Sequence, residues 1–168
     1  REIISNWSDD KNVGSSLFLG FTADKTVRFS DVFAAAGEIT NRKKPFILSA
    51  VNHSSGAAVF QSGRPIAARA QPLALRKLGT EWIIGQQGNI NGEFWQGGIA
   101  EIRLYNQALS PVHRQLVESR IAERYGLSVD HRTDHSLVDF PAPRTPEGMA
   151  LSSLCHVLIN SNEFIYVD

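Results

Sequence analysis

The change in apolar periodicity within Gly97–Gly126 constrains the fold of this chain more than any other sequence feature. Apolar and polar side chains alternate from Ala100 to Tyr105, which predicts a strand with one buried face. Ser110 and Pro111 then have the residue types of a helix N-cap and a first helical residue. The helix that follows ends at a glycine suited to the left-handed C′ position. The sequence therefore predicts a last sheet strand that leads directly into a covering helix.

Residue spacing along this helix predicts which of its faces is buried. The apolar residues expected on the buried face are Val112, Leu116, Val117, Ile121 and Tyr125. The charged residues expected outside that face are Arg114, Glu118, Arg120 and Glu123. His113 stands three residues after Ser110, where a capping box has Glu, so we expect a somewhat weak helix start.

The chain from Ile3 to about Tyr105 consists of short strand-like runs separated by clusters of Gly, Asn, Asp and Ser. Such spacing is typical of an all-β sandwich or barrel. Ser62 and Gly63 predict a tight hairpin turn, because glycine adopts the positive φ that two-residue hairpins require. We therefore expect an all-β fold.

Composition limits the partners of the protein. The 168 residues include 17 basic and 17 acidic side chains, which are dispersed, so no basic surface for nucleic acid is expected. Cys155 is the single cysteine, which excludes a disulfide within the chain. The longest apolar runs are far shorter than the roughly 20 residues of a membrane helix, so no membrane span is expected.

The pattern changes again after the covering helix. Residues 1–127 are expected to form one domain, and residues 128–145 are polar and proline-bearing, which is typical of a linker. Residues 146–168 predict a short helix and a terminal strand without an evident partner in the chain. This tail is expected to dock on other domains of a longer parent chain.

The segment "FWQGGIAEIRLYNQALSPVHRQLVESRIAERYGL", Phe94–Leu127, resembles the end of laminin-G-like domains of large bacterial proteins. "AAVFQSGRPIAA" and "EWIIGQQGNINGEFWQGGIAEI" resemble upstream hairpin and loop patterns of that family. The resemblance implies a concanavalin A-like antiparallel β-sandwich, or jelly roll. We expect the sandwich to be incomplete, with its first strands upstream of Arg1.

The tail "EGMALSSLCHVLINSNEFIYVD" is similar to the C-terminus of a planctomycete-type family of large exported proteins that often carry a cytochrome c-like domain. The resemblance implies an exported, periplasmic or cell-surface location. The biochemical role of that family is not established, so this resemblance does not define an activity.

A loop rich in Gly and Asn contains the candidate ligand-binding residues Asn89, Asn91 and Trp95. A flat aromatic face beside amides suits a sugar ring, and the alternative is that Trp95 plugs the loop. Trp82 lies in an apolar run and is expected in the core.

Asp9, Asp10 and Asn12 provide oxygen atoms in one expected hairpin loop. Calcium prefers such hard ligands, and laminin-G-like domains frequently hold calcium at a loop rim, so these three are calcium candidates. The same residue types form turns without any metal.

Three patterns with catalytic or cofactor chemistry are weak. Glu101 has no second acid on its strand, whereas glycosidases need two carboxylates. "SLCH" has Ser152 in place of the first cysteine of a haem-attachment motif. "DHRTDH", residues 130–135, has zinc-binding residue types but lies in the expected linker. We therefore expect a protein that is not an enzyme.

These observations favour a non-catalytic module that recognises a glycan or protein ligand. The alternative is an architectural domain that packs against or spaces neighbouring domains. An exposed Trp95 would favour recognition, and burial of its loop would favour architecture.

Overall fold

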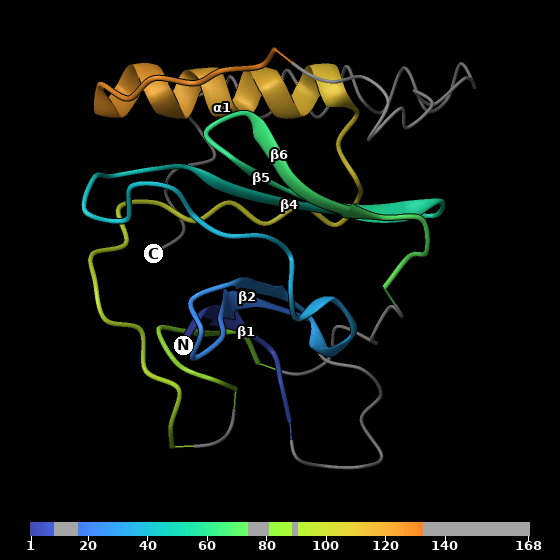
Figure 1. Cartoon of the computed structure of the whole chain (residues 1–168), viewed down its shortest axis with the longest axis vertical. Helices are drawn as coiled ribbons and strands as arrows, with labels where there is room; N and C mark the ends of the chain where they lie inside the picture. The colour runs from blue at the N-terminus through green and yellow to red at the C-terminus, as the bar shows by residue number, and fades with distance from the viewer. Residues whose placement is uncertain (9–16, 74–80, 89–90, 133–168) are drawn as a thin grey trace.

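The structure is a computed structural model, and it describes residues 1–8, 17–73, 81–88 and 91–132. The strands form two antiparallel sheets, and one α-helix lies across one of them, as Figure 1 shows. These two sheets and the helix agree with the expected all-β sandwich and its covering helix.

The first sheet has four strands in the order β3-β2-β1-β7. Its members are β1 (Glu2–Ser5), β2 (Phe18–Phe21), β3 (Val27–Phe29) and β7 (Ile83–Ile84). Phe18, Phe21, Val27 and Phe29 are buried, so β2 and β3 contribute most of its apolar surface. A short 3₁₀ helix, η1 (Asp31–Phe33), follows β3 and buries Phe33.

The second sheet has three strands in the order β4-β5-β6. Its members are β4 (Leu48–His53), β5 (Gly56–Gln61) and β6 (Arg64–Arg69). Ser62 and Gly63 join β5 to β6 with φ values of 46° and 89°, as expected for a two-residue hairpin turn. All six residues of β5 are buried, because this central strand has a neighbour on each side and cover on both faces.

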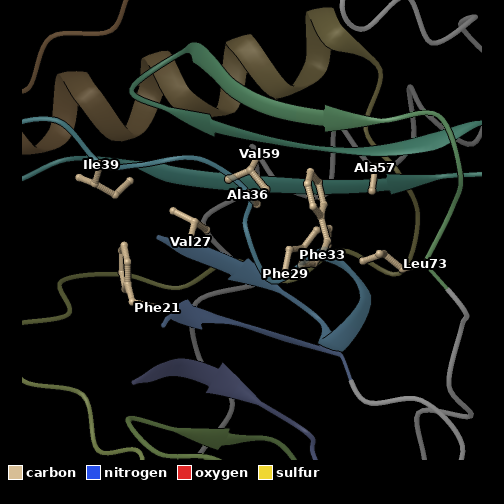
Figure 2. Packing of buried hydrophobic residues seen from close by; sticks show 9 residues of the cluster. All are labelled: Phe21, Val27, Phe29, Phe33, Ala36, Ile39, Ala57, Val59 and Leu73. Atoms are coloured by element: carbon tan, nitrogen blue, oxygen red, sulfur yellow. The ribbon is translucent and has the colours of Figure 1, made fainter. Parts of the chain in front are cut away.

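The main core lies between the two sheets, as Figure 2 shows. Ala57 and Val59 of β5 face Val27 and Phe29 of β3 across it. Ala58 and Phe60 alternate with them and form a second cluster with Val51 of β4. The period of two along β5 thus divides its side chains between two apolar environments.

The helix α1 (Pro111–Tyr125) has the ends that the sequence predicts. Ser110 is the N-cap, and its hydroxyl accepts a 3.3 Å hydrogen bond from the backbone N–H of His113. The His113 ring lies 3.1 Å from the same hydroxyl. Gly126 is left-handed, and the Leu127 amide donates to Ala122 across the helix end.

The buried face of α1 differs from the expectation. Its buried residues are Arg114, Glu118 and Ala122, whereas Val112 is 71% exposed. The guanidinium of Arg114 stacks on the ring of Phe60, with 3.6 Å between its central carbon and the ring centroid. A paired arginine with an aromatic platform can be buried, and hydrophobic periodicity does not detect such a pair.

The strand expected over residues 100–105 is not among the strands formed by the described residues. These residues form no ladder with the part of the chain that the structure describes, although their apolar and polar side chains alternate. A strand exists through hydrogen bonds to a neighbour, and alternation alone does not supply that neighbour. The segment instead runs as irregular chain between Trp95 and α1 (Figure 1).

Among the described residues, no helix has the length and apolar character needed to cross a membrane.

Candidate binding groove

A large groove opens beside β4, with a cavity volume of about 1650 Å³. Its walls are β4 with residues 42–47, the segment 95–109, strands β1 and β2, and α1. We call this the β4 groove. A cavity of this size exceeds the range of ordinary small-molecule pockets, roughly 300–1,000 Å³, so it suits a larger ligand such as a polypeptide segment.

The β4 groove continues the two apolar environments of the second sheet. Leu48 and Ala50 of β4 pack toward the main core, and Val51 packs toward the cluster that contains Phe60. Val117 and Ile121 of α1 line the groove on that second side. A strand placed beside β4 would therefore meet apolar surface on both of its faces.

Two segments along the groove have no ladder with the described residues on the groove side. β4 pairs with β5 alone among the described strands, so its other edge has no ladder there. Residues 98–105, which also line the groove, likewise have no ladder with described residues. Leu104 in this segment is 53% exposed. An open edge beside exposed apolar side chains is a template for adding a strand.

Trp95 lies at the inner wall of the groove and packs against the main core. Its ring stacks on Phe21, with 5.6 Å between ring centroids and 27° between planes. Its backbone N–H donates to Gly85 at 2.8 Å, which fixes the loop against β7. The indole Nε1 is buried and has no hydrogen-bond partner among the described residues. The ring therefore does not stand free as a sugar platform.

The structure describes two of the three residues expected to bind a sugar, Asn91 and Trp95. Asn91 is exposed, whereas the nearby Trp95 packs inward. Asn89 lies outside the described residues. The sequence predicted a site on this loop, whereas the apolar groove lies along β4. Alternation over residues 100–105 is a signal that could have indicated this groove, because it marks a strand in need of a neighbour.

The calcium candidates Asp9, Asp10 and Asn12 lie outside the described residues. Within the described part of the chain, no three His, Cys, Asp or Glu side chains gather as a metal site would require. Trp82 is half-buried and contributes to the groove wall.

Glu101 is held by two arginines at the end of the groove. Arg103 donates to one of its oxygens, and Arg124 of α1 donates to the other at 3.2 Å. Burial by itself would raise the pKa of Glu101, but the hydrogen bond and positive charge of Arg103 outweigh burial and lower it. The carboxylate therefore stays ionised and ties residues 101–103 to α1.

A polar cluster beneath α1 was not expected from the sequence. Arg114 donates to both oxygens of Glu118 at 2.8 and 2.7 Å, and His131 Nε2 lies 2.9 Å from Glu118. The i,i+4 spacing of Arg114 and Glu118 is a signal that could have indicated their pairing. This cluster fixes α1 to the sheet.

Residues 128–132, assigned to the linker from sequence, contact the β5–β6 turn. The Asp130 amide donates to Ser62 at 2.8 Å, and Arg64 donates to the Asp130 carboxylate at 3.1 Å. Hydrogen bonds from Arg132 are the main reason that the pKa of Asp130 lies well below its ordinary value. Asp134 and His135 lie outside the described residues.

Comparison of the chain with protein-family models, with curated proteins and with solved structures finds no match.

Proposed function

We propose that this chain is a non-catalytic recognition module that binds an extended segment of a protein ligand in the β4 groove. The observation that carries this proposal is a large apolar groove beside the edge of β4 that has no ladder with the described strands. Main-chain hydrogen bonds to such an edge provide affinity, and side-chain pockets provide selectivity. The two ion pairs of Glu101 support a structural rather than a catalytic carboxylate.

The proposed parent is an exported bacterial protein, on the resemblance to laminin-G-like and planctomycete-type sequences described above. The two antiparallel sheets are compatible with a concanavalin A-like jelly roll, and we propose that finer assignment on the same resemblance. A glycan ligand is less favoured than a protein ligand, because the ring of Trp95 packs on Phe21.

The architectural alternative has a specific observation in its favour. The loop that contains Trp95 is anchored to Gly85 and packs against the core, as expected of a covering domain. In that case the groove would hold a neighbouring part of the parent chain permanently rather than exchange ligands.

Binding of the full chain to synthetic apolar peptides and to immobilised polysaccharides separates these functions. We expect saturable peptide binding that Leu104→Asp abolishes, because it places a charge in the groove wall. Val112→Asp is the matched control, since Val112 is 71% exposed on α1 and does not line the groove. Val112→Asp should bind the peptides as the unmutated chain does.

Two other outcomes would contradict the proposal. Polysaccharide binding that survives Leu104→Asp but is lost on Asn91→Ala would support a glycan site on the loop. Loss of that binding with a chelator would add the calcium candidates. Absence of all binding by the folded chain would favour the architectural role. Trp95→Ala is unsuitable as the diagnostic variant, because it removes core packing against Phe21.

A further inference from the structure

We infer that residues 163–168 of this same chain, "EFIYVD", are the resident occupant of the β4 groove, placed as a strand antiparallel to β4. This inference rests on the proposed function, because it requires the groove to accept a polypeptide. It also implies that an external ligand must displace residues 163–168 from the β4 groove.

The faces of the groove define the side-chain pattern of an occupant. Leu48 and Ala50 of β4 face the main core, and Val51 faces the cluster beside α1. A strand next to β4 inherits the same two environments, so it needs apolar side chains on both faces. A strand with one polar face would place that face against Val117 and Ile121.

The segment 163–168 has this pattern. Phe164 and Tyr166 fall on one face of a strand, and Ile165 and Val167 fall on the other. All four are aromatic or β-branched, which are the residue types that sheets favour. Its length equals that of β4, which spans six residues.

Charge sets the direction of the occupant. Arg42, Lys43 and Lys44 are exposed at the end of the groove where the chain enters β4. An antiparallel occupant places its last residue at that end, so Asp168 approaches these cations. A parallel occupant would place Asp168 at the opposite end.

The chain is long enough to make this contact. Residue 132 is the last described residue and lies near the turn between β5 and β6, since Asp130 binds Ser62. The 30 residues from 133 to 162 can span about 100 Å when extended, which exceeds the dimensions of a domain of this size.

Hydrogen exchange of the full chain tests the inference. We expect the β4 amides on the edge away from β5 to exchange at least tenfold more slowly in the unmutated chain than in the double variant Ile165→Asp/Val167→Asp, where their protection is lost. The matched control is Asn160→Asp/Asn162→Asp, which adds the same charge outside the segment and should retain protection. Amides of β5 should be unchanged in both variants, which shows that the fold persists.

A synthetic peptide with the sequence of residues 160–168 separates failure of the inference from failure of the proposed function. Added to Ile165→Asp/Val167→Asp, it should restore protection of the β4 edge. If the β4 edge is unprotected in the unmutated chain but the peptide protects it, the inference is overturned and the proposed function stands. An edge that stays unprotected with saturating peptide would contradict both.

Dilution distinguishes a contact within one chain from a contact between copies. Protection that is independent of protein concentration supports occupancy by the chain's own segment. Protection that falls on dilution, together with a dimer by light scattering, would identify a second copy as the occupant and overturn the inference.

Discussion

Glu2 is a buried carboxyl group whose ionisation opposes folding. Its side chain is 0% exposed, Arg28 lies 3.5 Å from one oxygen, and the other oxygen has no partner among the described residues. Burial is the main cause that raises its pKa from 4.5 to about 7, and the positive charge of Arg28 only partly opposes this. The protonated form therefore suits its site better than the carboxylate.

Glu2→Gln should stabilise the protein at alkaline pH. Because the folded-state pKa lies above the unfolded value, the stability associated with the bound proton is complete below pH 4.5 and is lost as pH rises toward 7. The rise from 4.5 to about 7 corresponds to about 3 kcal/mol at most, and Gln avoids this loss. Denaturant unfolding at pH 4, 6 and 8 measures the effect.

The exposed Glu38 provides the control for this experiment. Glu38→Gln should change stability by less than about 0.5 kcal/mol at each of these pH values, as is usual for an exposed position. An equal slope of stability against pH in the unmutated protein and in Glu2→Gln would show that Glu2 does not control this pH dependence.

At the scale of elements, the ion pair of Arg114 and Glu118 decides how α1 packs. Glu118 is 2% exposed and accepts from Arg114, which stacks on Phe60 of β5. Two buried charges of opposite sign are tolerated because each satisfies the other, and removal of either leaves an unpaired charge. Hydrophobic periodicity alone therefore placed Val117 and Ile121 toward the protein but missed the burial of Arg114 and Glu118.

Glu118→Ala should destabilise the protein by about 3–5 kcal/mol, because it leaves the Arg114 guanidinium buried without a carboxylate. The double variant Arg114→Met/Glu118→Leu should recover most of this loss, since apolar residues can fill the same space. Glu123→Ala, at an exposed position of the same helix, is the control and should change stability by less than about 0.5 kcal/mol. Urea unfolding gives all three values, and a mild effect of Glu118→Ala would show that the pair is solvated.

Across the whole molecule, stability should be unequally distributed between the sheets. β5 pairs on both sides and is buried on both faces, whereas β7 is a two-residue strand at an edge. Strands with more pairing and burial open through larger unfolding events. The second sheet with α1 is therefore the more stable part.

Hydrogen exchange should show this difference directly. Amides of β5 should exchange only through global unfolding, and those of Ile83–Ile84 should exchange at least 100-fold faster through local opening. The groove variant Leu104→Asp and its control Val112→Asp should not change this ranking. Equal protection of β5 and β7 would indicate that the molecule opens as a single unit.

Much of the fold could be predicted from local chemistry in the sequence. Ser110, Pro111 and Gly126 define the ends of α1, and Ser62 with Gly63 defines the β5–β6 turn. Each depends on a cap or a backbone conformation that neighbouring residues determine. The site was less predictable, because the β4 groove is formed by segments far apart in the chain.

The sequence by itself determined the elements with local causes, namely the helix ends, the tight turn and the alternating apolar faces. Only the tertiary structure decided that residues 98–105 have no strand partner among the described residues, that Trp95 packs on Phe21, and that Arg114 is buried. The physical reason is that pairing and burial depend on the neighbour present in space. An alternating pattern shows the need for a neighbour, whereas the fold determines whether that neighbour is there.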